Sequence, residues 1–177
     1  MTVDPVPTRT SGRANTGDVL LDGLIAGALG ALTAALWFLV LDLAAGRPLR
    51  TPALLGTALL HRGAAAPQAG AVAPLEVAAY TAFHVLVFFA IGIGFSWLMM
   101  RFERFPILGF VLLVLFLCLQ LGFFFLEVAL GAQLPGQLSP WSVMVANLLA
   151  AGSISLYLWK RHPRIAEGLR HIWDDEP

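Results

Sequence analysis

The sequence is poor in charged residues, which make up 12% of its 177 residues. A soluble domain usually carries about 25%. The 11 basic and 11 acidic residues give a formal net charge of zero. Because binding to nucleic acid depends on a basic surface that neutralises phosphates, this balance argues against a nucleic-acid partner.

Cysteine and catalytic motifs are also scarce. The single cysteine, Cys118, excludes an internal disulfide and a cluster of thiolate metal ligands. The chain contains no G-x-S-x-G, no H-E-x-x-H, no phosphate-binding loop and no dinucleotide fingerprint. We therefore expect a protein that is not an enzyme, and we expect Cys118 to be buried among leucines near the middle of a membrane.

Hydrophobic residues make up 58% of the chain, and the mean hydropathy is +0.78. Four runs without Asp, Glu, Lys or Arg cover residues 23–41, 77–100, 107–126 and 141–159. A helix of about 20 apolar residues crosses the hydrocarbon core, and a helix also satisfies its own backbone there. The sequence predicts an all-α integral membrane four-helix bundle at residues 18–160, with spans at about 20–44, 76–100, 106–131 and 140–160.

Three segments lie outside these spans. Residues 1–17 lack apolar periodicity and are expected to form a disordered cytoplasmic arm. In the first outer loop, Thr51 can cap a short interfacial helix that ends near Gly63 and places Leu55 and Leu59 on one stripe. The tail, residues 161–177, is predicted to be an amphipathic cytoplasmic helix that docks on lipid or on a partner subunit. Its apolar stripe consists of Ile165, Leu169, Ile172 and Trp173.

The basic residues indicate how the chain is oriented. Eight of them flank the side that carries both termini, whereas Arg47, Arg50 and Arg62 lie in the first loop on the other side. Because basic residues are retained in the cytoplasm, both termini are predicted to be cytoplasmic in a multi-pass protein of the bacterial inner membrane.

Polar side chains recur at one depth near the outer ends of the four spans. A helix rises about 1.5 Å per residue, so the outer layer receives one polar residue from each span. Tyr80 shares a helical face with its neighbour four residues on, and Gln120 shares one with its neighbour seven residues on. The predicted intramembrane cluster consists of Asp42, Tyr80, His84, Gln120, Glu127 and Asn147.

Two interpretations of this cluster remain open. In the first, it is a hydrogen-bonded clamp that fixes helix register. In the second, it binds a ligand or ion, and His84 is then a candidate axial ligand for haem or for the magnesium of a chlorin. A metal held by His84, Glu127 and Asp42 is chemically allowed, although the Glu-x-x-His spacing of carboxylate-rich bundles is missing.

Small residues line one side of the first span at Gly23, Gly27, Gly30 and Ala34, which permits close approach of another helix. With apolar faces on every span, these features favour an accessory or scaffolding subunit of a larger respiratory or photosynthetic membrane complex. Its partners would be membrane lipids and other integral membrane subunits, with contact to lipid, carotenoid, (bacterio)chlorophyll or haem. The alternative is a small transporter or a ligand-, metal- or haem-binding membrane protein that uses the polar layer.

Overall fold

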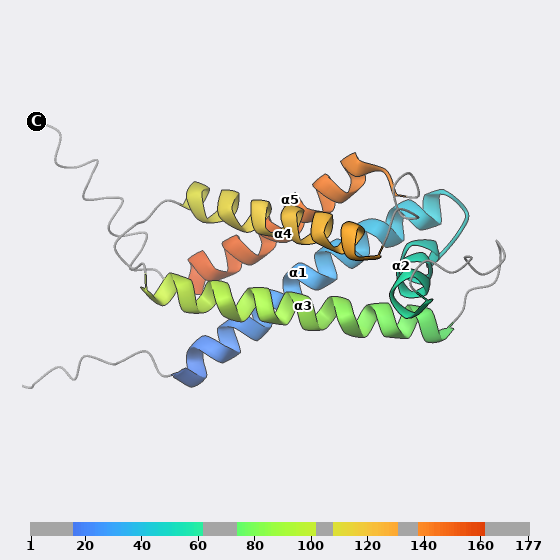
Figure 1. Ribbon diagram of the computed structural model, residues 1–177. Helices are drawn as coiled ribbons and strands as arrows, with labels where there is room; N and C mark the ends of the chain where they lie inside the picture. Colours follow the sequence, from blue (N-terminus) through green and yellow to red (C-terminus); the bar gives the residue numbers. More distant parts are fainter. Residues whose placement is uncertain (1–15, 62–73, 102–107, 131–137, 162–177) are drawn as a thin grey trace, which may run out of the picture.

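The computed structural model describes residues 16–61, 74–101, 108–130 and 138–161 (Figure 1). This part of the chain is entirely helical apart from its turns, and it contains no strand. Five helices follow one another: α1 (Thr16–Ala44), α2 (Arg50–His61), α3 (Pro74–Arg101), α4 (Leu108–Leu130) and α5 (Pro140–Arg161). All except α2 are long and apolar enough to cross a membrane, which agrees with the predicted multi-pass membrane protein.

The ends of the long helices follow local sequence signals. Both α3 and α5 begin at a proline, which fits the first turn because its missing N–H has no partner there. At the end of α1, Gly46 has a φ of 66°. The amide of Arg47 donates to the Asp42 carbonyl at 2.9 Å, and the amide of Gly46 donates to the Leu43 carbonyl at 2.9 Å. This is a Schellman end, in which glycine adopts the left-handed conformation at little cost.

The structure moves two predicted boundaries. Helix α1 begins at Thr16, inside the segment predicted to be a disordered arm, and α5 includes Arg161. The remainder of the arm, the tail beyond Arg161 and the predicted helix end at Gly63 all lie outside the described residues. The tail residues in question are Ile165, Leu169, Ile172 and Trp173.

Helix α1 lies at the centre of the packing arrangement, with α3 and α5 against it. Helix α4 packs mainly on α5, and α2 packs on α3, so contacts between the spans run in the order α3, α1, α5, α4 (Figure 1). A buried cluster with members from all four long helices forms the main core, and it includes Phe88, Leu115, Ala150 and Ile154.

Glycines allow α1 and α3 to cross closely. A Cβ added at Gly23 would lie 2.5 Å from the Ile93 Cα, and one added at Gly27 would meet the Phe88 carbonyl oxygen. Gly30 faces the Ile154 side chain of α5, and Ala34 is also buried. The four small residues singled out in the first span therefore lie at helix contacts within the chain.

Helix α2 closes one end of the molecule, which we call the α2 end; the opposite end, where α1 begins and α5 ends, is the termini-proximal end (Figure 1). Leu55 and Ala58 of α2 join Leu138 and Val143 in a second buried cluster, and Phe38 packs against it. Leu55 is almost completely buried, whereas Leu59 is half-buried. The short helix predicted in this loop therefore packs on the protein through the Leu55 side.

Candidate functional site

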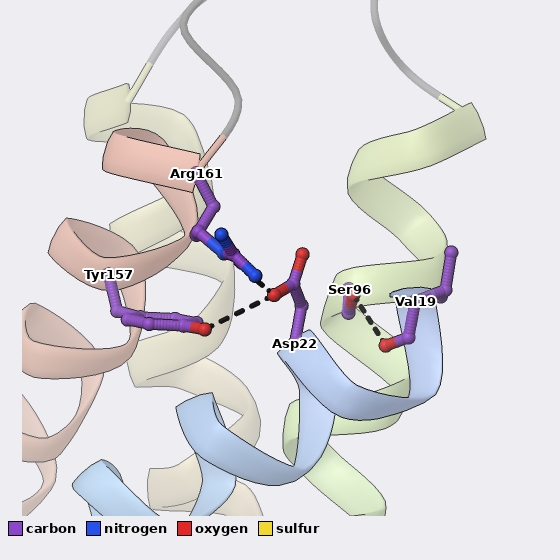
Figure 2. A network of polar contacts seen from close by, with 5 residues as sticks. All are labelled: Val19, Asp22, Ser96, Tyr157 and Arg161. Atoms are coloured by element: carbon purple, nitrogen blue, oxygen red, sulfur yellow. Dashed lines mark hydrogen bonds and ion pairs between the residues drawn. The ribbon is translucent and has the colours of Figure 1, made fainter. Parts of the chain in front are cut away.

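The most connected polar group of the described residues lies at the termini-proximal end, around Asp22 (Figure 2). The Asp22 Oδ1 atom accepts hydrogen bonds from Tyr157 Oη at 3.1 Å and from Arg161 Nε at 2.9 Å. Asp22 is buried, whereas 53% of the Arg161 side chain is exposed. Since Tyr157 and Arg161 lie four residues apart on α5, one helical face presents both donors to the carboxylate.

A second contact ties α3 into the same end. The Ser96 hydroxyl is buried and donates to the Val19 carbonyl at 2.9 Å (Figure 2). The starts of α1 and the ends of α3 and α5 are thereby joined by hydrogen bonds in a region where apolar packing alone distinguishes poorly between helix faces. We call Asp22, Tyr157, Arg161 and Ser96 the termini-proximal network.

Sequence reasoning missed this network. The apolar run of the first span was counted from Gly23, so Asp22 fell just outside the residues considered as intramembrane polar groups. The available signal was the four-residue spacing of Tyr157 and Arg161, because it places a hydroxyl and a guanidinium on one face of a span.

His84 lies between α1 and α3. Its Nε2 atom is 3.2 Å from the Ala31 carbonyl oxygen, and its Nδ1 atom is 3.5 Å from Tyr80 Oη. The carbonyl can only accept, so the contacts assign the ring proton to Nε2 and leave the Nδ1 lone pair facing the tyrosine hydroxyl. The ring also stacks at a tilt on Phe88, with 4.7 Å between centroids. Binding a metal through Nε2 would require His84 to give up its bond to α1.

Asn147 and Gln120 form the second pair of the predicted layer. The Asn147 Nδ2 atom donates to Gln120 Oε1 at 2.9 Å, which links α5 to α4. Glu127 lies two turns beyond Gln120 on α4 and is half-buried. No hydrogen bond or ion pair joins Glu127 to another of the described residues.

Asp42 has a different partner. Its Oδ2 accepts the amide of Thr51 at 2.7 Å, and its Oδ1 accepts the Thr51 hydroxyl at 2.9 Å. The carboxylate of α1 therefore caps α2, whereas the sequence predicted that Thr51 would be the cap. A carboxylate is favourable here because it meets the positive end of the α2 dipole.

The six residues of the predicted polar layer are thus distributed over separate contacts. Tyr80 and His84 adjoin each other, and Gln120 bonds Asn147. Asp42 bonds a residue that was not in the predicted set, and Glu127 stands apart from both pairs. Hydrogen bonds between the described residues do not join these groups into one network, and whether the layer binds a ligand stays a prediction.

The search for metal ligands gives a limited result. Within residues 16–61, 74–101, 108–130 and 138–161, no three His, Cys, Asp or Glu side chains gather closely enough to hold an ion. Cys118 is exposed on α4, and its predicted burial among leucines is wrong. The reason is that α4 packs chiefly on α5, which leaves the side with Cys118 uncovered.

One buried polar atom has no hydrogen-bond partner among the described residues, the hydroxyl oxygen of Ser155 on α5. We expect Ser155→Ala to leave the free energy of unfolding unchanged or to raise it by about 1 kcal/mol, because a desolvated hydroxyl without a partner is unfavourable. Chemical unfolding of the purified protein in mixed micelles measures this change. Ser96→Ala is the matched control and should be destabilising, because it removes a formed bond; a Ser155→Ala loss of equal size would contradict the expectation.

Searches against protein-family models, curated protein sequences and solved structures found no match to this chain.

Proposed function

We propose that the chain is an accessory or scaffolding subunit of a larger bacterial membrane complex, respiratory or photosynthetic. The four long helices form a membrane-spanning bundle in this proposal. Helix α2 and the amphipathic tail lie at the two interfaces, and both chain termini are cytoplasmic. Lipids and the spans of other subunits are the partners.

The observation that carries the proposal is the uncovered side of α4. This helix packs mainly on α5, and the opposite side exposes large apolar residues over its whole length. They are Phe110, Leu113, Leu117, Leu121, Phe124, Phe125 and Val128. Because lipid tails are as apolar as leucine, spans associate through shape and packing, and a surface of bulky aromatic and branched side chains offers both to a neighbouring helix.

The orientation is supported by the basic residues at the helix ends. Arg101, Lys160 and Arg161 end α3 and α5 at the termini-proximal end, whereas Arg47 and Arg50 lie near the start of α2. The excess of positive charge at the termini-proximal end favours placing that end in the cytoplasm.

The test uses Cys118, the single cysteine of the chain, which is exposed on α4. Intact membranes are treated with a photo-crosslinker attached through a maleimide, and adducts are identified by mass after purification in a mild detergent. We expect the same membrane subunits to appear as adducts and as co-purifying proteins, with Cys118→Ser as the control. A stable monomer that forms adducts only with lipid would contradict the proposal.

A second candidate function is ligand binding or transport through the polar layer. The observation that favours it is Glu127, a half-buried carboxylate within a span that lacks a partner among the described residues. Ionisable groups at such positions are uncommon without a role. Under this proposal Glu127→Gln and His84→Ala abolish binding or transport while the protein still assembles. The visible spectrum separates out the haem case, because bound haem produces a Soret band.

The clamp interpretation makes the opposite prediction for His84. If the bond to the Ala31 carbonyl serves only packing, His84→Ala lowers the free energy of unfolding by about 1 kcal/mol, the size typical of hydrogen bonds between spans. Chemical unfolding in mixed micelles gives this value. Thr81→Ala is the matched control, since the Thr81 hydroxyl bonds only within its own helix, to the Val77 carbonyl, and a loss of equal size there would contradict the clamp.

A further inference from the structure

The termini-proximal network holds one guanidinium along one edge and leaves its other edge open. Arg161 donates from Nε to Asp22, which Tyr157 also contacts, and about half of the arginine side chain is exposed (Figure 2). A guanidinium has five N–H donors. Among the described residues, only the Nε–H of Arg161 has an acceptor, so the four terminal N–H groups are available to a ligand.

The surroundings of Arg161 favour an anionic ligand at a membrane boundary. Lys160 is exposed beside it, and α3 ends at the same end of the molecule with Arg101. The described acidic residues there are Asp22, which is already engaged, and Asp18, which is exposed on the first turn of α1. The described side chains therefore leave one positive charge in excess.

We propose that this end binds the phosphate group of an anionic phospholipid, with Arg161 as the binding residue and Asp22 and Tyr157 as positioning residues. The planar fork of an arginine matches two phosphate oxygens, and holding its Nε in place reduces the rotamer freedom lost on binding. A lipid is the favoured source of the phosphate because Arg161 ends a membrane-spanning helix, at the level of the lipid headgroups. The proposal stands apart from the scaffolding function, since a monomer can bind lipid equally well.

The full-length chain, purified in mild detergent, is titrated with phosphatidylglycerol or with phosphatidylcholine of the same acyl chains, and bound lipid is counted by native mass spectrometry. We expect preferential retention of phosphatidylglycerol. Arg161→Gln should weaken this retention about fivefold, and Lys160→Gln, the matched loss of a neighbouring charge, should weaken it less than about twofold. Equal retention of the two lipids, or equal effects of the two variants, would overturn the proposal.

The positioning role of Asp22 gives the sharpest test. If attraction depended only on overall charge, Asp22→Ala would strengthen retention of phosphatidylglycerol, because it removes a negative charge. The proposal predicts about threefold weaker retention instead, since Arg161 loses its fixed orientation. Arg161→Lys keeps the charge without the fork and should also retain less lipid than the wild type. Stronger retention by Asp22→Ala, or unchanged retention by Arg161→Lys, overturns the proposal.

Two further arms guard the interpretation. Circular dichroism confirms that each variant remains helical; if Asp22→Ala fails to fold, Tyr157→Phe replaces it, because it removes one hydrogen bond to Asp22 and changes no charge. About twofold weaker retention is then expected, and unchanged retention would overturn the role given to Tyr157. Inorganic phosphate is added as a competitor. Displacement of phosphatidylglycerol by inorganic phosphate alone would assign the site to free phosphate and overturn the lipid assignment.

Discussion

The Gly92→Ala variant is expected to lose about 3 kcal/mol of unfolding free energy, the upper part of the range for overpacked sites. An added Cβ at Gly92 would meet the Gly23 carbonyl oxygen and would lie 2.6 Å from the Gly27 amide nitrogen. Both are backbone atoms of α1, which cannot rotate away as a side chain can. The two helices would have to separate, and the contacts along their crossing would weaken together.

Gly94 provides the matched control on the same helix. It is exposed, and a Cβ there would find nothing within 4 Å. Gly94→Ala should therefore leave stability unchanged or raise it slightly, since alanine is the better helix former. Both variants are compared by unfolding in mixed micelles of increasing dodecyl sulfate content. Equal midpoints for the two variants would mean that α1 and α3 are not in close contact.

The Asp42→Ala variant is expected to release α2 from the end of α1, at a cost of about 3 kcal/mol. Asp42 is buried and accepts two hydrogen bonds from Thr51, and bonds to a charged acceptor are worth about 1.5–3 kcal/mol each. Without the carboxylate, the first turn of α2 loses both its cap and a favourable charge at its positive end. Hydrogen exchange of the amides of residues 51–57 should become about 100-fold faster.

Two variants delimit this effect. Asp18→Ala removes an exposed acid from the first turn of the same helix and should leave exchange in α2 unchanged. Asp42→Asn keeps one oxygen acceptor and should lie between the alanine variant and the wild type. If exchange at residues 51–57 were the same in Asp42→Ala and in the wild type, α2 would owe its position to the packing of Leu55 and Gly56 and not to the cap.

Gly56 shows how little of this docking could be predicted. The sequence indicated a short helix in the loop and a stripe formed by Leu55 and Leu59. It gave no sign that α2 approaches the start of α3 so closely that a Cβ on Gly56 would meet the Glu76 carbonyl oxygen. His61 also lies 3.4 Å from the Glu76 carboxylate. These contacts depend on where α3 begins relative to α2, and the residues between them carry no pattern that fixes this distance.

The sequence by itself determined the helices. Four apolar runs without charge are long enough to cross a bilayer, and backbone groups in lipid must be satisfied within the segment, so neither strand nor irregular chain can replace them. The prolines at the starts of α3 and α5 and the glycine after α1 also marked the helix ends correctly. These features depend only on nearby residues, which is why composition and spacing were sufficient.

Only the tertiary structure decided which faces meet. In a soluble protein, alternation between polar and apolar residues reveals the buried face, but in a membrane both the lipid and the protein interior are apolar. The exposure of Cys118, the pairing of His84 with the Ala31 carbonyl and the contact of Arg161 with Asp22 therefore depend on helix rotation and crossing. A helix can turn about its axis in lipid at almost no hydrophobic cost, so packing shape and a few hydrogen bonds fix the arrangement.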